Sequence, residues 1–271
     1  MALIEPTILA ADADRTARAL GACVERFAIV VVEECDSTNS ALRDFPPEDD
    51  GRTHVLVAHH QRAGRGRRGR TWQAWPGLSL TFSSLWRFAP SPTVPAGLSL
   101  VAGLAVACTL EKLGVEGVQL KWPNDVMVFG KKIAGILVEL VPGRGRTPAA
   151  VIGIGVNLAL PSGTHIPDQP GVTSLADEIA TSKIEASTVL AGILISLDDL
   201  LERYTQGGFA ALRDEWQQRN AFADLPVSVR DEQCETVGIC AGVDEDGALL
   251  LDTDQGRTRI IAGDVSLRAA L

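Results

Sequence analysis

The chain has 271 residues, of which 46% are hydrophobic and 22% are charged, and its formal net charge is −9. This composition is typical of a folded chain with a sizeable core, long enough for one large domain or for one domain plus a small one. The acidic balance disfavours a protein that binds nucleic acid.

The cysteines and histidines indicate which disulfide and metal sites the protein can have. The five cysteines form no C-x-x-C pair, which favours free thiols in a reducing compartment over a disulfide framework. The four histidines form no H-E-x-x-H pattern and no Cys/His cluster, which disfavours a zinc site made by protein alone. The N-terminus has no basic region followed by an apolar one, so no signal peptide is predicted and we expect a cytoplasmic protein.

The first elements in chain order are a helix, a strand and a second helix. Apolar residues at helical spacing predict one amphipathic helix over residues 15–27, before a first strand at 29–33. One helix is too little for a helix-turn-helix DNA-binding domain. Residues 36–39 read Asp-Ser-Thr-Asn, which are helix N-cap types, and predict a helix to about residue 43.

The middle of the chain predicts strands and three further helices. The strands cover residues 54–59, 77–87, 118–122, 126–129, 133–140 and 149–157, with turns at 90–95, 123–124, 130–131 and 142–148 and an irregular loop at 164–171. The helices cover 96–113, 187–204 and 209–219. The first of these is long and apolar, but Gly97, Gly103 and the pair Glu111-Lys112 interrupt it. It therefore predicts a buried helix and not a membrane span.

The texture of the sequence changes after Asp224. Five short strands are predicted at 227–230, 235–241, 248–252, 257–261 and 265–267, with turns at 244–247 and 254–256. This spacing predicts a small all-β barrel. We therefore expect two domains, at 1–223 and 224–271, and the larger one begins with a helical extension at 1–28.

Residues 64–70, Gly-Arg-Gly-Arg-Arg-Gly-Arg, put four arginines and three glycines into seven positions. Glycine allows a ligand to approach the main chain, and the arginine fork suits phosphates and carboxylates, so this loop is predicted to hold an anion. The alternative is a solvated basic turn. With Thr71 the loop is close to the P-loop pattern G-x-x-x-x-G-K-[ST], but Pro76-Gly77 stops the helix that a P-loop requires.

Three other segments are candidates for chemistry. Residues 121–125 read Lys-Trp-Pro-Asn-Asp. Asn124 and Asp125 can hydrogen-bond a polar ring of a ligand or a metal-bound water, or they form only an Asx turn that closes a hairpin. Lys131 and Lys132 open an apolar strand, either as a charged strand edge or as cations for a ligand carboxylate. Gly153 and Gly155 within a strand indicate close approach of a ligand or of another backbone. No nucleophile elbow or acidic pair is present in the sequence, which suits a reaction that ATP activates and the protein positions.

Taken together, these segments resemble the biotin protein ligase family, also called biotin–[acetyl-CoA-carboxylase] ligase. The matching segments occur in the family's order: 36–39, Gln61 with 64–70 and Trp72, 121–125, 132–135, 153–157, and 263–268. The resemblance implies an α+β fold. The catalytic domain would be a mixed β-sheet with flanking helices, in the class II aminoacyl-tRNA synthetase-like or biotin–lipoate ligase fold, and an SH3-like β-barrel would follow it.

The family resemblance also implies a reaction and a site. Biotin and Mg·ATP give biotinyl-5′-AMP and pyrophosphate, and a carrier lysine then takes the biotin. Lys132 and Arg67 would be catalytic. Biotin would be bound by Ser37, Thr38, Asn39, Gln61, Gly64, Arg65, Arg67, Lys132, Gly135, Gly153 and Gly155. ATP and the adenylate would be bound by Arg67, Arg68, Arg70, Trp72, Asn124, Asp125, Lys132, Asn157 and Arg268. No metal ligands are predicted in the protein itself.

The partners implied are biotin, ATP with Mg²⁺ and a biotin carboxyl carrier protein or domain, with no DNA and no membrane. Bifunctional members of the family carry an N-terminal winged helix-turn-helix, and only about 28 residues precede the strand at 29–33 here, so we expect a monofunctional ligase. The chain would be a monomer or a homodimer. The alternatives are a lipoate or octanoate ligase, a nucleic-acid-binding regulator and a biotin-binding module without catalysis.

Overall fold

The computed structural model describes residues 7–88, 96–141, 148–164, 166, 171–181, 183–230 and 235–261, and the backbone of 266–269; within these ranges a mixed sheet of seven strands lies at the centre. Its order is β2 (Phe27–Cys35), β3 (Thr53–Gln61), β4 (Ser79–Arg87), β8 (Ala149–Asn157), β7 (Lys131–Val141), β6 (Asp125–Val128) and β5 (Val118–Lys121). The first two strands are parallel and every other neighbouring pair is antiparallel. The predicted mixed sheet is confirmed.

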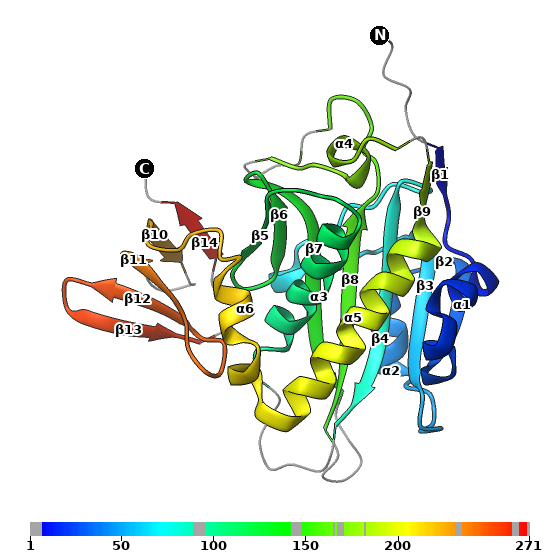
Figure 1. The fold of residues 1–271 in the computed structure, drawn as a ribbon, viewed down its shortest axis with the longest axis horizontal. Helices are drawn as coiled ribbons and strands as arrows, with labels where there is room; N and C mark the ends of the chain where they lie inside the picture. Colours follow the sequence, from blue (N-terminus) through cyan, green and yellow to red (C-terminus); the bar gives the residue numbers. More distant parts are fainter. Residues whose placement is uncertain are drawn as a thin grey trace.

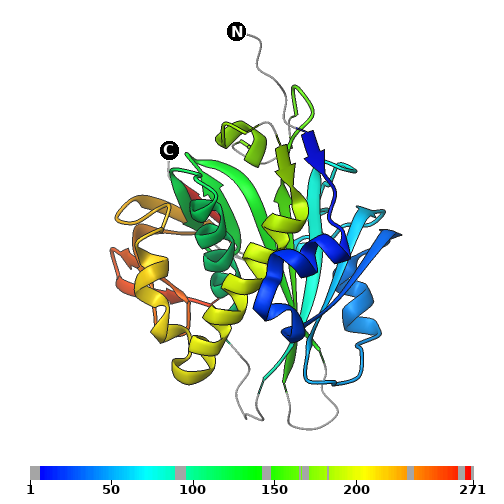
Figure 2. The same cartoon turned by 45° about the vertical axis from the view of Figure 1, so that its right-hand side comes forward.

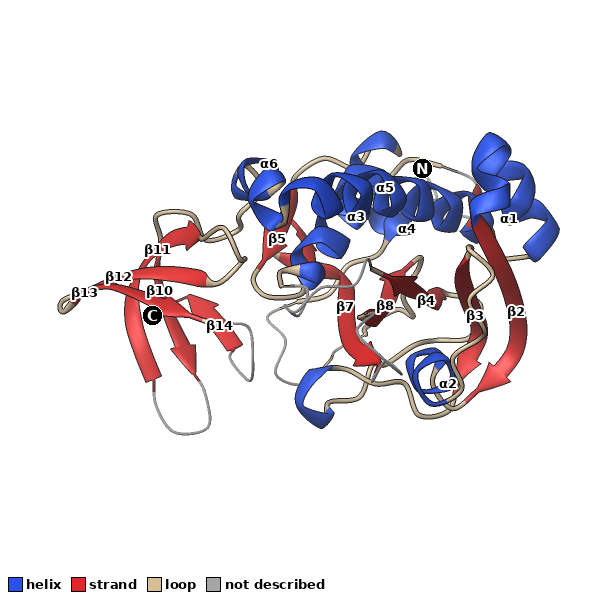
Figure 3. Ribbon diagram, turned by 90° about the horizontal axis from the view of Figure 1, so that it is seen from below, coloured by secondary structure: helices blue, strands red, loops and turns tan. Residues whose placement is uncertain are grey.

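Helices cover the two faces of this sheet unequally. α1 (Ala13–Leu20), α3 (Leu98–Lys112) and α5 (Ala186–Gly207) lie on one face, and α2 (Thr38–Asp44) lies on the other (Figures 1 and 3). α3 is apolar on most sides because it packs between the sheet and α5. The spacing of six apolar residues in α5 predicts its inner face, and all six are buried: Leu190, Ile193, Leu194, Leu197, Leu200 and Leu201. The α2 face is therefore the more open one, and the candidate site lies there.

Two predicted helices are shorter than the apolar pattern suggests. The helix expected over 15–27 ends at Leu20, because Gly21 adopts a φ of 55°, and a 3₁₀ helix, η1 (Gly21–Arg26), follows. The helix expected over 209–219 divides into η3 (Phe209–Ala211) and α6 (Arg213–Gln217). In both places the apolar spacing continues through a break in the backbone.

Three short elements were not predicted. β1 (Thr7–Leu9) pairs in parallel with β9 (Lys183–Glu185), and α4 (Leu175–Glu178) precedes β9 (Figure 1). The extension at 1–28 that was expected to be helical therefore contains a strand as well as α1, and β2 is not the first strand. The turn predicted at 90–95 lies outside the described residues, as does 142–147.

The C-terminal part is a separate antiparallel sheet at the end of the molecule far from α1 (Figures 1 and 2). Within the described ranges it contains β10 (Pro226–Arg230), β11 (Glu235–Val243), β12 (Leu249–Thr253), β13 (Gly256–Ile260) and β14 (Ser266–Ala269), in the order β13-β12-β11-β10-β14. All five strands were predicted, and the small all-β domain is confirmed. The exact boundary at residue 223 stays a prediction.

The two parts are joined by specific contacts. The indole Nε1 of Trp122, which has no exposed surface, donates to the carbonyl of Gly247 at 3.0 Å. The backbone N–H of Val243 donates to Oε1 of Gln217 at 3.1 Å. Trp122 precedes Pro123, Asn124 and Asp125, so the C-terminal sheet supports a segment that the sequence marked as a candidate site.

Candidate active site

The floor of the site is a row of small residues across three central strands. Gly135 of β7 pairs with Gly155 of β8, and Gly155 pairs with Thr81 of β4. In the next row on the same face, Gly153 lies beside Ser83. Side chains alternate along a strand, so both rows face the same side of the sheet, and all five residues line one pocket.

The glycines in these rows are required by what packs on them. A Cβ atom at Gly155 would lie 2.3 Å from Cε2 of the Trp72 indole, and one at Gly153 would lie 2.0 Å from Oδ1 of Asn39. At Gly135 the nearest atom, Cζ3 of Trp72, would be 3.1 Å away. The sheet surface is therefore hollowed to receive two side chains from other elements, whereas the glycine density had predicted the approach of a ligand or of another backbone.

One end of the pocket is formed by the start of α2. Ser37 is the N-cap residue, and the backbone N–H of Thr38 donates to Oε1 of Gln61 at 2.8 Å. The Thr38 hydroxyl lies 3.1 Å from the same Oε1 and 2.7 Å from Oγ of Ser83. Ser83 in turn donates to Oδ1 of Asn39 at 2.6 Å. This end offers neutral hydrogen-bonding groups, held in place by one another, and we call it the polar end.

The arginine loop is a narrow hairpin that crosses the pocket. Gly64 and Trp72 are joined by a 3.0 Å hydrogen bond, and the backbone N–H of Gly66 donates to the carbonyl of Arg70 at 2.7 Å. The tip is a single 3₁₀ turn in which Arg68 has a φ of 57°. No α-helix follows the loop before β4, which agrees with the rejection of a P-loop. The loop places Arg65, Arg67, Arg68 and Arg70 along the pocket.

The opposite end of the pocket carries charge. Nζ of Lys132 lies 2.6 Å from Oδ1 of Asp125 and 5.7 Å from the centre of the Trp72 ring, within cation–π range. Nη1 of Arg67 donates to Oδ1 of Asn124 at 3.5 Å, and Nδ2 of Asn124 donates to the carbonyl of Ile136 at 2.8 Å. We call this the cationic end.

The indole of Trp72 carries a polar atom that is unpaired within the part of the chain that the structure describes. Among the described residues, its indole Nε1 is buried and has no hydrogen-bond partner. A buried N–H without a partner costs free energy, so this position favours a ligand acceptor beside it. The ring itself covers Gly135 and Gly155.

The structure brings most of the predicted site residues together. One pocket is lined by Ser37, Thr38, Asn39, Gln61, Arg65, Arg67, Arg68, Arg70, Trp72, Asn124, Asp125, Lys132, Gly135, Gly153 and Gly155. Asn157 lines an adjoining pocket that also contains Trp72 and Lys132, and its amide donates to the carbonyl of Thr173 at 3.0 Å. Gly64 closes the base of the arginine loop. The backbone of Arg268 belongs to β14, and its side chain lies outside the described residues.

Two family models match the chain: the biotin/lipoate A/B protein ligase family over residues 31–157, and the biotin protein ligase C-terminal domain over residues 226–268. The bifunctional ligase/repressor BirA of Escherichia coli is 36% identical over 242 residues, which cover 89% of this chain and 74% of that protein. This chain belongs to the biotin protein ligase family.

A second relative and a solved structure support the same family. The biotin–[acetyl-CoA-carboxylase] ligase of Paracoccus denitrificans is 36% identical over 238 residues, covering 85% of this chain and 96% of that protein. The structure of the biotin protein ligase from Aquifex aeolicus in complex with biotin and ATP matches with a TM-score of 0.76 at 28% identity, over 89% of this chain and 99% of that one. The predicted fold is confirmed, and biotin is favoured over the lipoate or octanoate alternative.

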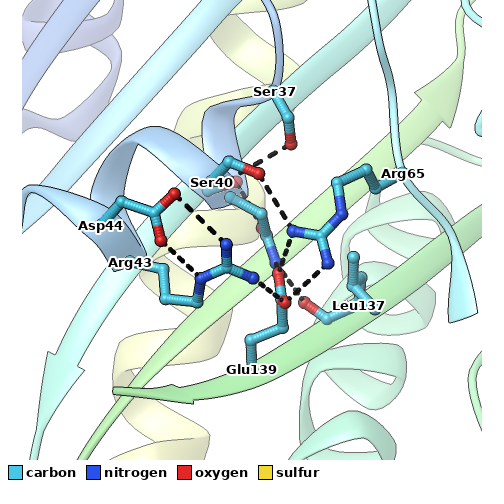
Figure 4. A network of polar contacts seen from close by, with 9 residues as sticks. Ser37, Ser40, Arg43, Asp44, Arg65, Leu137 and Glu139 are labelled. Atoms are coloured by element: carbon cyan, nitrogen blue, oxygen red, sulfur yellow. Dashed lines mark hydrogen bonds and ion pairs between the residues drawn. The ribbon is translucent and has the colours of Figure 1, made fainter. Parts of the chain in front are cut away.

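Sequence reasoning missed several polar residues of this ligase's pocket. Ser83 and Thr81 come from β4, where their alternation with apolar residues was visible but was taken only as a strand pattern. Glu139, which lies beside the pocket, was also missed, although it is an acidic residue in the apolar second half of β7. Its carboxylate accepts a hydrogen bond from Asn39, and another from Arg65 that Figure 4 shows.

Proposed function

We propose that this ligase transfers biotin to a lysine of a biotin carboxyl carrier protein or domain in two ATP-dependent steps. In the first step, a carboxylate oxygen of biotin attacks the α-phosphorus of ATP, the bond from that phosphorus to the bridging oxygen breaks, and pyrophosphate leaves. In the second step, the lysine amine attacks the acyl carbon of biotinyl-5′-AMP, loses a proton and displaces AMP. The name biotin–[acetyl-CoA-carboxylase] ligase, carried by relatives at 35% and 36% identity, supports this reaction and its carrier.

The observation that carries the proposal is a single pocket that joins the polar end to the cationic end across a glycine floor. A neutral cyclic urea is recognised by hydrogen bonds, which Ser37, Thr38 and Gln61 supply. The slot over Gly135 and Gly155 suits an apolar chain that approaches the backbone closely. The carboxylate of biotin would then point toward Lys132.

Charge neutralisation is the main catalytic task at the cationic end. Negative charge builds between the biotin carboxylate and the α-phosphate, and preorganised cations lower its free energy most in a site that excludes water. Lys132 and Arg67 are assigned this role. Asp125 holds the Lys132 ammonium at 2.6 Å, which fixes its direction.

The remaining predicted residues are assigned to the nucleotide: Arg68, Arg70, Trp72, Asn124, Asn157 and Arg268. Mg²⁺ is proposed to enter bound to ATP, because it keeps several waters and phosphate oxygens as ligands. Within the described ranges, no group of three or more His, Cys, Asp and Glu is placed to hold a metal ion.

The cellular location and the partners are proposed from the free cysteines, the exposed edge of the sheet and the net charge. The four cysteines that the structure describes, at positions 23, 35, 108 and 240, are free thiols, which favours the cytoplasm. No helix in the described ranges is long and apolar enough to cross a membrane.

β2 is an edge strand with Val30 55% exposed, so we expect the carrier domain, or a second copy of the chain, to add a strand there. A net charge of −9 argues against DNA.

Labelled biotin or lipoate, ATP and a carrier domain test the proposal directly. Biotin-dependent exchange of pyrophosphate into ATP is expected, followed by transfer of label from biotin to the carrier. Transfer from lipoate alone would contradict the substrate, and biotin binding without exchange would reduce the protein to a binding module. Binding to duplex DNA with a steep dependence on salt would restore the regulator alternative.

A further inference from the structure

Glu139 joins three parts of the molecule that meet beside the pocket. Its Oε2 accepts hydrogen bonds from Nδ2 of Asn39 at 3.0 Å and from Nη1 of Arg65 at 3.1 Å. Its Oε1 accepts from Nη2 of Arg65 at 2.9 Å and from Nη1 of Arg43 at 2.6 Å. Asn39 and Arg43 belong to α2, Arg65 belongs to the arginine loop, and Glu139 belongs to β7 (Figure 4).

The Glu139 side chain is only 17% exposed, and charge at this depth is stable only with good partners. Both terminal nitrogens of Arg65 point at its two carboxylate oxygens, which is the bidentate geometry of a strong charge-assisted pair. Arg65 also donates to Oγ of Ser40 at 3.0 Å. Burial raises the pKa of Glu139, but hydrogen bonds from Asn39, Arg65 and Arg43 outweigh burial and lower that pKa below its ordinary value.

The Arg65–Glu139 pair lies at the N-terminal base of the arginine loop. Arg65 directly follows Gly64, whose carbonyl is bonded to Trp72, so Arg65 marks the point where the loop leaves the body of the protein. The two bonds of the Arg65–Glu139 fork, at 2.9 and 3.1 Å, are shorter than the bond from Arg67 to Asn124, which at 3.5 Å is at the long limit for a hydrogen bond. The fork therefore attaches the base of the loop firmly to β7.

We propose that Glu139 is a positioning residue, which holds the arginine loop over the pocket by binding Arg65 and so sets the affinity for biotin. This proposal rests on the ligase activity proposed above, and it assigns different roles to the arginines of the loop. The charge of Arg65 is matched by Glu139 and serves as an anchor, while Arg67 and Lys132 meet the reacting anion. Glu139 touches no reacting atom in this scheme, because it acts through Arg65.

The structure offers a matched control for this role. Arg43 donates to the same carboxylate, but it lies on α2 and also pairs with Asp44 at 2.8 Å. Arg43→Gln therefore removes one donor from Glu139 and leaves the fork to the loop in place. A purely structural role of Glu139 would make Arg43→Gln and Glu139→Gln behave alike.

Trypsin reports the position of the loop, because the loop carries its own cleavage sites at arginines. Glu139→Gln is expected to be cut between residues 64 and 71 about tenfold faster than the wild type, since loss of a charge-assisted fork raises the open population by about that factor. Arg43→Gln is expected to stay within about twofold of the wild type, because both bonds from Arg65 to Glu139 remain in place. Cleavage at Arg68, followed by mass spectrometry on the full chain, measures both.

A double mutant shows whether Glu139 acts through Arg65. Arg65→Gln should accelerate cleavage at Arg68 as much as Glu139→Gln does, and combining the two should add nothing, because each removes the same interaction. Equal cleavage of Glu139→Gln and wild type, or additive effects in the double mutant, would overturn the proposal. Thermal unfolding of each variant identifies any that fails to fold, and Glu139→Asp, which keeps the charge, should recover part of the protection.

Kinetics then connects the anchor with the reaction. Glu139→Gln should raise KM for biotin about tenfold in pyrophosphate exchange while kcat changes little, since the loop would close less often but react normally once closed. A fall in kcat at unchanged KM would contradict a positioning role. Absence of exchange in the wild type would instead reject the proposed function and would leave the trypsin result valid by itself.

Discussion

The polar end and the cationic end of the pocket are built in opposite ways. At the polar end, Thr38 and Asn39 are 3% and 4% exposed, and their side chains are joined through Ser83, while Thr38 also contacts Gln61, with distances of 2.6 to 3.1 Å. At the cationic end, charged groups meet: Nζ of Lys132 lies 2.6 Å from Oδ1 of Asp125, and Nη1 of Arg67 lies 3.5 Å from Oδ1 of Asn124. Nε1 of Trp72 is buried there without a partner among the described residues.

This difference separates recognition from chemistry. A closed network of neutral groups has little freedom to adapt, so it selects a ligand by the placement of donors and acceptors. The cations of the other end stabilise charge that appears only in the transition state. We therefore expect changes at the polar end to raise KM for biotin, and changes at the cationic end to lower kcat.

The largest effect is expected from Lys132→Ala. Removing a cation aimed at developing charge should lower kcat for biotin-dependent pyrophosphate exchange by on the order of 10²- to 10³-fold. Asp125 would also lose its partner at 2.6 Å, so thermal unfolding must be measured to show that the fold is intact. An unchanged exchange rate would remove Lys132 from the mechanism and would break the division between the two ends.

Arg67→Ala should follow, with a fall in kcat of roughly 10²-fold for the same reason. Arg62→Ala is its matched control, because Arg62 lies just before the loop and pairs on the surface with Glu34 and Asp36, both at 2.8 Å. Exposed pairs of this kind contribute little, so Arg62→Ala should keep the wild-type rate. Equal losses in both variants would point to general disruption of the loop and not to charge in the site.

Thr38→Val should produce the opposite kinetic pattern at the polar end. The change removes the hydroxyl shared with Gln61 and Ser83 but keeps the volume, so KM for biotin should rise roughly tenfold, the cost of one buried hydrogen bond, while kcat stays close to normal. Steady-state exchange at varied biotin measures both constants. A fall in kcat with unchanged KM would place Thr38 with the chemistry.

Much of this arrangement follows from local sequence, because the signals lie within single elements. Burial of one side of an element produces a regular pattern in its sequence. Such patterns are the leucine and isoleucine spacing of α5 and the short strand-like runs of the C-terminal sheet. The N-cap at Ser37 and the failure of the P-loop pattern at Pro76-Gly77 are likewise local. The assignment of site residues depended on the family resemblance, since spacing alone left a solvated basic turn open.

What could not be predicted depends on distant pairing. Glu139 meets Arg65 and Arg43 across 74 and 96 residues of sequence, and the register of β7 against β8 places Gly135 beside Gly155, where Trp72 covers both. The break at Gly21 and the three-residue β1 were missed for another reason. One interrupts a pattern that otherwise continues, and the other is too short to have a pattern.

The smallest expected effect is a pH dependence of stability through Glu139, which lies beside the pocket and accepts a hydrogen bond from Asn39 of the polar end. The pKa of Glu139 is lowered from its ordinary value of 4.5, because the bonds from Asn39, Arg65 and Arg43 outweigh the effect of burial. The stability it adds is therefore fully present above about pH 4.5, the unfolded-state pKa, and is lost as pH falls through the lower pKa of the folded state.

Urea unfolding of wild type and Glu139→Gln, at a series of pH values, measures this contribution. Near neutral pH the variant should be less stable by about 1 kcal/mol, the order of one charged hydrogen bond after solvent screening. The difference between the two proteins should shrink only below pH 4.5, because glutamine does not titrate and the wild type alone gains a proton. A difference that already fades between pH 7 and 5 would mean that the carboxylate is not held by its donors, and Glu139 would then not stabilise the contact between α2, β7 and the arginine loop.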